Sequence, residues 1–269
     1  MLRGRLLGLM MLMACLPLVA QDTSQPAAPG DQHTWDFHFQ STLIGQGVLP
    51  FSAAYSGTNS LEPHGEIKDT FSFDVTARAR LWRGGEFFAD VLSWQGYGLS
   101  KTTGVAGFPS GEAYRVGKTF PDAVVSRAYL RETVLLGGEG NSGANPAVTS
   151  GGPNDERRIR FTVGRFAATD VFDKNTYAND PRTQFMNWAF ISNAAWDYPA
   201  NSLGLTNGAS AELDLRSWSA RAGIFQVSHV ANAIRLDWNI LHAWSWVGEL
   251  EKRHSFGGHH GAVRLLAYE

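Results

Sequence analysis

A regular alternation of side chains over residues 69–82 constrains the fold more than any other feature of the chain. Phe71 and Phe73 fall on one face of an extended strand, and Ser72 and Asp74 fall on the other. Successive side chains of a strand point to opposite faces, so this segment predicts a strand with an apolar and a charged face. Such a strand suits a soluble sheet, whose polar face meets bulk water. It equally suits a membrane barrel, whose apolar face meets lipid while its polar face lines a water-filled lumen.

The same pattern recurs along the chain in segments of strand length. Most of them approach the roughly 9–11 residues that a tilted strand needs to cross a bilayer. We expect nine strands, at residues 34–42, 69–82, 86–94, 123–134, 158–166, 208–214, 217–227, 240–252 and 261–268. Part of the connection 43–66 is a candidate for a helix. The chain is therefore predicted to be all-β, a transmembrane antiparallel β-barrel of porin type.

The predicted connections differ in length in the manner of outer-membrane barrels, which have short periplasmic turns and long external loops. The short turns are 83–86, 214–217 and 255–261, and the long loops are 95–122, 167–207 and 228–239. The long segment 135–157 falls on the turn side and is interpreted as a flexible insertion. Bacterial single-chain barrels have even strand numbers. Nine strands, with no turn after the last, therefore predict a barrel that is incomplete at its C-terminus.

The N-terminus predicts export from the cytoplasm. Residues 1–20 combine a basic start, the short apolar run Leu6–Cys15 and a small residue before a polar segment, which is typical of a cleaved signal peptide. A lipoprotein site at Cys15 is the less favoured alternative. Residues 21–33 are expected to form a flexible periplasmic leader, and residues 34–269 the barrel domain.

Several segments of the chain resemble a known protein family. Residues 98–117 read GLSKTTGVAGFPSGEAYRVG, residues 128–133 read AYLRET, and residues 163–180 read VGRFAATDVFDKNTYAND. Together with residues 218–226 and 247–251, they closely resemble, in the same order, segments of the carbohydrate-selective porins of the OprB family.

This resemblance extends from about Trp35 to the last residue. It implies an outer-membrane barrel of about 16 strands in a Gram-negative bacterium, through which mono- and oligosaccharides diffuse passively into the periplasm. The chain would hold the N-terminal half of that barrel or slightly more. Carbohydrate solutes and outer-membrane lipid are the expected partners, and a homotrimer is left open as the assembly. A net charge of −2 gives no reason to expect a nucleic-acid partner.

Strand parity selects the side chains that would face the lumen. Arginine on the lipid face would cost about 2–4 kcal/mol at the midplane, so the arginines are assigned to the polar face. In strand 123–134 the same parity places Val124 on the outer face. The candidate pore-lining and sugar-binding residues are Asp74, Arg78, Arg80, Asp90, Arg127, Tyr129, Arg131, Arg158, Arg160 and Arg221.

These residue types suit a sugar. Guanidinium groups can donate paired hydrogen bonds to neighbouring hydroxyls, carboxylates can accept from them, and aromatic rings can stack on a pyranose. The alternative for each arginine is a structural ion pair with Asp or Glu across the lumen wall. Trp35, Trp82, Trp94 and Trp196 are interpreted as parts of aromatic girdles at the membrane interfaces.

The long loops 95–122 and 167–207 are the candidates to fold inward and narrow the pore, because loops of this length are usually functional or disordered. The second loop carries a polar cluster of candidate constriction residues, Asp170, Asp173, Asn175 and Asp180. The alternative for these residues is Asx-turn chemistry that shapes the loop. A calcium site is less favoured because the spacing differs from the calcium loop of EF-hands. No metal or cofactor is expected.

No motif in the chain predicts an enzyme. The Gly-x-Ser-x-Gly elbow, the phosphate-binding loop and the His-Glu-x-x-His motif are all missing from the sequence. A sugar-selective porin of the Gram-negative outer membrane is therefore the preferred interpretation. The alternatives are a pore for anionic solutes, which the arginines would suit, and a soluble exported sugar-binding β protein.

Overall fold

The computed structural model describes residues 34–101, 110–112, 121–136, 157–187, 190–192, 196–230, 233–239 and 242–269. The described residues belong to one compact unit, His33–Glu269. The predicted signal peptide, the leader and most of the predicted insertion at 135–157 lie outside them. Among the described residues, no helix is long and apolar enough to cross a membrane.

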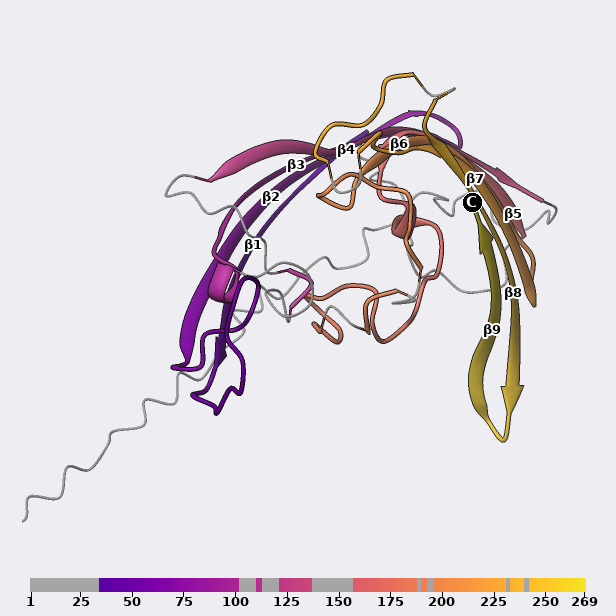
Figure 1. Ribbon diagram of the computed structural model, residues 1–269. Coiled ribbons are helices and arrows are strands. Elements are labelled where there is room, and N and C mark those ends of the chain that lie inside the picture. The colour runs from indigo at the N-terminus through magenta and orange to yellow at the C-terminus, as the bar shows by residue number, and fades with distance from the viewer. Residues whose placement is uncertain are drawn as a thin grey trace, which may run out of the picture. The chain divides into compact units, whose positions relative to one another are not determined.

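The described residues form one antiparallel sheet of nine strands in sequential order (Figure 1). The strands are β1 (Trp35–Val48), β2 (Glu66–Trp82), β3 (Gly85–Gly96), β4 (Asp122–Leu135), β5 (Arg158–Phe166), β6 (Thr206–Asp214), β7 (Trp218–Gln226), β8 (Trp244–Phe256) and β9 (His259–Tyr268). Two short 3-10 helices, η1 (Leu99–Lys101) and η3 (Ala168–Asp170), lie in the loops. The sheet is curved and not closed, since β1 pairs only with β2 and β9 only with β8 in this part of the chain. The predicted all-β fold, a partial porin-type barrel, is confirmed.

Two expectations about the first strands require correction or extension. β1 continues to Val48, because Leu43 and Ile44 extend the pairing with Phe71 and Thr70 of β2. The remaining residues 49–65 contain no helix, so the suggested helix in this connection was wrong. The tight turns were predicted correctly: Gly84 joins β2 to β3 with a φ of 90°, a conformation that glycine adopts readily.

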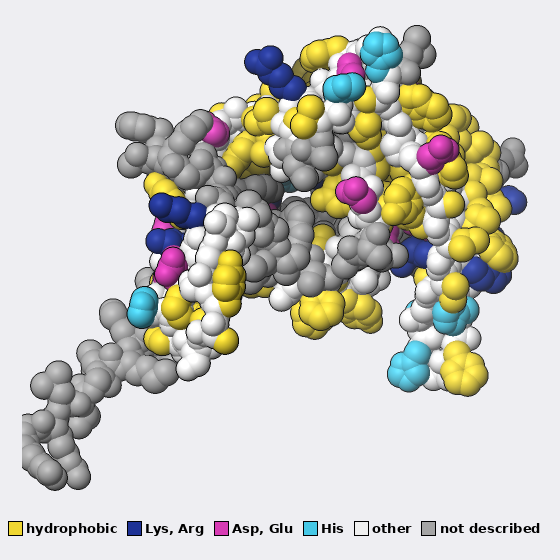
Figure 2. Space-filling model, in the orientation of Figure 1, with side chains coloured by type: hydrophobic (Ala, Val, Ile, Leu, Met, Phe, Trp, Pro, Cys, Tyr) yellow, Lys and Arg dark blue, Asp and Glu magenta, His cyan; other side chains and the backbone are white. Residues whose placement is uncertain are grey.

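The two faces of the sheet reverse the usual arrangement of a soluble protein. On β2, Phe71 and Phe73 are 45% and 39% exposed, whereas Ser72 and Asp74 are 0% and 5% exposed. We call the face with the buried polar residues the inner face and the opposite face the outer face. Figure 2 shows hydrophobic side chains gathered over the outside of the C-terminal strands. An apolar outer face and a polar inner face are typical of a transmembrane barrel.

The apolar part of the outer face has the height of a bilayer core. On β2 it runs from Phe71 to Leu81, about ten residues, or about 33 Å along the strand. A strand tilt of about 45° reduces this to about 23 Å, close to the band of about 25 Å in outer-membrane barrels. On β5 the band ends at Arg165, whose guanidinium donates to the carbonyl oxygen of Val125 at 2.7 Å.

A β-bulge in β4 reverses the parity of its first residues. Asp90 pairs with Arg127 and Val91 pairs with Val125, so Ser126 is an extra residue on β4. Its hydroxyl is buried on the inner face and contacts Asp90. Val125 is consequently on the outer face and 48% exposed. The assignment of Val124 to the outer face was therefore wrong, because a bulge shifts the alternation by one residue.

Candidate pore wall and constriction loop

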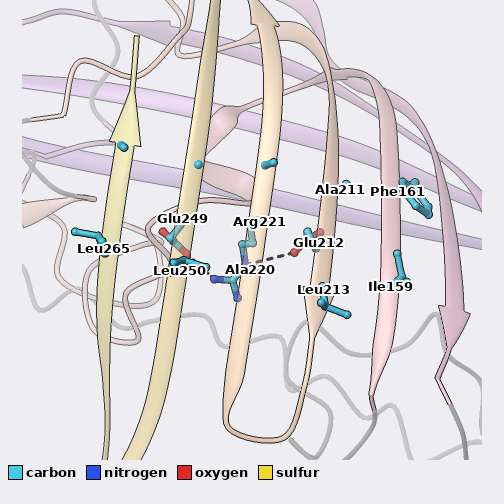
Figure 3. A pocket seen from close by; sticks show the side chains of 13 residues that line it. Ile159, Phe161, Ala211, Glu212, Leu213, Ala220, Arg221, Glu249, Leu250 and Leu265 are labelled. Carbon is cyan, nitrogen blue, oxygen red and sulfur yellow. Dashed lines mark hydrogen bonds and ion pairs between the residues drawn. The ribbon is translucent and has the colours of Figure 1, made fainter.

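Arginine and carboxylate side chains alternate across the inner face of neighbouring strands. Arg158 of β5 contacts Asp214 of β6 at 3.1 Å. One position further along, Arg160 of β5 contacts Glu212 of β6 at 3.4 Å, and Glu212 lies 3.7 Å from Arg221 of β7. Figure 3 shows Arg221 and Glu212 approaching each other across the strand boundary. Sheet pairing places these side chains opposite one another, as cross-strand pairs require.

The alternation continues to the last strand. Arg221 contacts Glu249 and Glu251 of β8, at 2.5 and 3.3 Å. Glu251 in turn contacts Arg264 of β9 at 2.8 Å and Arg253 of its own strand at 2.7 Å. Five strands, β5 to β9, are therefore linked on the inner face by one network of ion pairs, most of which are also hydrogen bonds.

Arg131 and Arg78 also lie beside carboxylates. Arg131 contacts Glu86 at 3.3 Å and donates to the hydroxyl of Thr162 at 3.2 Å. Arg78 forms an ion pair with Asp36 of β1, which the sequence interpretation had not selected. Arg80 lies on the same face of β2 and is partly buried. The structural alternative considered for the arginines, a paired ladder, thus describes their positions well.

Tyr129 supports the wall from within an aromatic cluster. Its ring is 8% exposed, stacks on Phe88 at 5.1 Å between centroids and meets Phe166 edge-on at 6.1 Å. The guanidinium of Arg131 covers it at 4.7 Å from the ring centre. Tyr129 therefore packs against the protein instead of offering a free face to a sugar ring.

The loop at residues 167–187 lies against the inner face and contacts strands far apart in the sheet. At its start, Asp170 accepts two hydrogen bonds from Arg127 of β4, each 2.7 Å long. Arg127 also lies 3.3 Å from Asp90 of β3. Near its middle, the backbone N–H of Asp173 donates to Glu249 of β8 at 2.6 Å.

At its far end the same loop reaches β2. Arg182 contacts Asp74 of β2 and Glu112 of the preceding long loop, both at 2.8 Å. Glu112 also accepts from the hydroxyl of Ser72 at 2.9 Å. An isolated β-bridge between Ser110 and Asn187 joins the two long loops. The loop therefore crosses the inner face from β8 to β2, which is the placement expected of a constriction loop.

Apolar contacts hold the first part of the loop in place. Val171 and Phe172 are 1% and 0% exposed, and Phe172 packs edge-on against Phe225 of β7 and against Trp196. The girdle interpretation of Trp196 was wrong, since its ring belongs to this buried cluster. Trp94 lies buried on the inner face and is also not a girdle residue. Trp35 and Trp82 are more than half exposed, as a girdle requires.

The remaining polar residues of the loop shape its backbone. The side chain of Asn175 accepts a hydrogen bond from the N–H of Tyr177 at 2.8 Å. Asp180 accepts from the N–H of Arg182 and from the hydroxyl of Thr183, both at 2.9 Å. These contacts are Asx-turn chemistry, the alternative considered for this cluster. In the part of the chain that the structure describes, no three His, Cys, Asp or Glu side chains gather as a metal site would require.

The charge of Asp170 is stabilised by its surroundings. Burial raises the pKa of this carboxyl, but the charge of Arg127 and the hydrogen bonds from Arg127 and the N–H of Ala167 outweigh burial. The net effect places the pKa of Asp170 below its ordinary value. The Asp170 contact is therefore an ion pair at neutral pH.

The sequence interpretation missed several residues that build this site. Arg182 and Glu112 lie in loops without periodicity, where no parity rule applies. Phe166 and Phe225 occupy inner-face positions of β5 and β7 and are both 0% exposed. The parity of those strands would have placed them on the inner face, but their apolar character gave no reason to select them.

An open antiparallel sheet with an apolar outer face, a charged inner face and a loop folded against that face defines the wall of a porin-type barrel. The carbohydrate-selective porin model of the OprB family matches residues 58–268. The chain belongs to this family, whose members are outer-membrane transport channels. A search of curated proteins found no match.

A solved structure has the same fold. The high-pH structure of Pseudomonas putida OprB matches with a TM-score of 0.55 and 16% sequence identity, covering 87% of this chain and 52% of that chain. The chain thus spans about half the length of that porin. At this identity the likeness establishes the fold, and the predicted family resemblance is confirmed by the family model.

Proposed function

We propose that the chain forms the wall and constriction of a pore for passive, selective diffusion of neutral sugars into the periplasm. One observation carries the proposal. Each of the arginines Arg127, Arg131, Arg158, Arg160 and Arg221 lies within 4.0 Å of a carboxylate. The inner face is therefore rich in hydrogen-bonding groups, while its positive charges are locally compensated.

Such a wall suits solutes with many hydroxyl groups and no charge. A guanidinium has five N–H donors, and Arg160 uses only Nη1 in its contact with Glu212. Donors left over on the arginines, and oxygens left over on the carboxylates, can bind sugar hydroxyls in turn. A solute that exchanges contacts along a row of equivalent groups is held weakly at each, as rapid passage requires.

The alternatives receive less support. A pore for anions needs uncompensated positive charge along its lumen, whereas these arginines are paired. A soluble sugar-binding protein would expose its apolar outer face, including Phe73 and Phe161, to water. The ion pairs of Asp170 and Arg182, which hold the loop 167–187 against the inner face, support a constriction formed by this loop.

The proposal is tested by reconstituting the protein in planar lipid bilayers. Neutral sugars such as glucose and maltose should reduce the ion current in a concentration-dependent manner, and the reversal potential in a salt gradient should show little anion preference. Arg160→Gln should weaken sugar block about fivefold, because about 1 kcal/mol of hydrogen bonding is lost. Arg165→Gln on the outer face is the matched control and should leave block unchanged.

A strong anion preference without sugar block would replace this proposal by the anionic-solute pore. Equal sugar block in the Arg160→Gln variant and in the unmodified protein would contradict a role for the arginine ladder.

A further inference from the structure

An apolar groove of about 500 Å³ crosses the outer face of β5–β9, opposite the arginine ladder (Figure 3). Its floor is a row of small residues on neighbouring strands, because Ala211 pairs with Ala222, Ala222 with Gly248, and Gly248 with Ala267. Phe161, the partner of Ala211 on β5, closes one end of the row. With strands about 4.8 Å apart, the floor is about 14 Å long.

Larger side chains form the side of the groove that faces the short turns. Leu213 and Leu250 line the groove there, one outward position nearer the turns than its floor. On the side that faces the turns, the small side chain of Ala220 lies between Leu213 and Leu250 and leaves a gap in that side, because Ala220 pairs with both. Ala220 and Ala222 of β7 therefore form a passage of small side chains from the turn side into the groove.

This passage opens beside a cation. The next outward pair toward the turns is Trp218 and Lys252, and the Lys252 ammonium lies 4.6 Å from the centre of the Trp218 ring. The neighbouring Glu251 is engaged on the inner face by Arg221 and Arg264. Among the described residues, no carboxylate lies within ion-pair distance of Lys252. Tryptophan and lysine at the edge of an apolar band lie at the level of lipid headgroups.

We propose that the groove binds one acyl chain of an anionic phospholipid whose phosphate contacts Lys252. Charge complementarity supports this occupant: an apolar groove leads, through Ala220, to the ammonium of Lys252 at headgroup level. A sugar or a polar peptide would lose its hydration on this surface without gaining hydrogen bonds. The proposal depends on the outer face meeting lipid, and it is independent of the solute that crosses the pore.

Native mass spectrometry of the protein in detergent tests this assignment. Dioleoyl-phosphatidylglycerol, which is anionic, and dioleoyl-phosphatidylcholine, which is zwitterionic, are each titrated and the bound lipid is counted. The protein should retain the anionic lipid about fivefold more tightly, as expected for one lysine near an anionic headgroup. Lys252→Gln should abolish this preference. Retention without preference in the unmodified protein, or an unchanged preference in Lys252→Gln, would overturn the headgroup assignment.

A second pair of variants tests the groove itself. Ala222→Leu fills the floor and should weaken retention of both lipids by a similar factor. Ala89→Leu, at an outer-face alanine of β3 outside the groove, is the matched control and should leave the retention of both lipids unchanged. Equal effects of the two variants would overturn the acyl-chain assignment. Sugar block of the current, measured on the same samples, depends on the inner face and so separates failure of this proposal from failure of the pore function.

Discussion

Removing the Asp170 carboxylate tests whether polar contacts hold the loop 167–187 against the sheet. Asp170 accepts two hydrogen bonds of 2.7 Å from Arg127 and one of 3.0 Å from the N–H of Ala167. Breaking a buried pair by removing one partner costs about 3–5 kcal/mol. Asp90, 3.3 Å from Arg127, would still compensate part of the remaining charge. We therefore expect Asp170→Ala to destabilise the docked loop by about 2–3 kcal/mol, at or just below the lower end of that range.

This free energy corresponds to an undocked population about 30- to 140-fold larger. Trypsin cleaves after Lys174 and Arg182, both in the loop, and the cleavage rate follows the open population when opening is fast relative to cleavage. The rate at Lys174 should therefore rise by a similar factor in Asp170→Ala. Asp197→Ala removes an exposed carboxylate and serves as the control. Cleavage of Asp170→Ala at the unmodified rate, with the sheet intact, would mean that apolar contacts alone dock the loop.

Three further predictions concern the same region. Because its folded-state pKa is lowered, Asp170 should stabilise the docked loop fully above about pH 4 and lose this effect as the pH falls through that lowered pKa. Tryptophan fluorescence between pH 7 and pH 2 should therefore show a transition in the unmodified protein that Asp170→Asn lacks. Arg182→Ala should remove the ion pair between Arg182 and Asp74 and destabilise the far end of the loop by about 2 kcal/mol. Proteolysis at this end of the loop should then be faster, and an unchanged rate would argue against Arg182 as an anchor. Gly164→Ala should cost about 1–3 kcal/mol in urea unfolding from lipid vesicles, because φ is 137° and the new Cβ would lie 2.4 Å from a carbonyl oxygen of β4. Gly248→Ala, whose Cβ would meet nothing within 3.7 Å, should cost less than half as much.

The strands and their faces were largely predictable because they depend on local rules. Alternation over β2 and the glycines of the short turns are sufficient to predict the meander of neighbouring strands. The bulge at Ser126 was not predictable, since a serine in an alternating run has the same sequence signature with or without an extra residue. Its effect is confined to the start of β4, where Val124 and Val125 exchange faces.

The loop that lies against the inner face was predictable as a loop but not as a set of contacts. Length identified the segment that folds inward, and the polar cluster drew attention to Asp170. Arg182, the anchor at the far end, has no periodic or motif signal, because its partner Asp74 is brought near only by the curvature of the sheet. Trp196 was misassigned because tryptophan suits both a lipid interface and an aromatic core, and composition does not separate these environments.

The anchors of the loop also determine the order in which the structure can assemble. Strands that are neighbours in the sheet are neighbours in the chain, so each hairpin can form from local contacts. The loop contacts instead join residues 43, 70 and 76 positions apart, on β4, on the preceding loop and on β8. They require strands that are already in place. The docked loop is therefore expected to form last, after the sheet around it has folded. Mutations in its anchors should speed undocking more than they slow folding of the sheet.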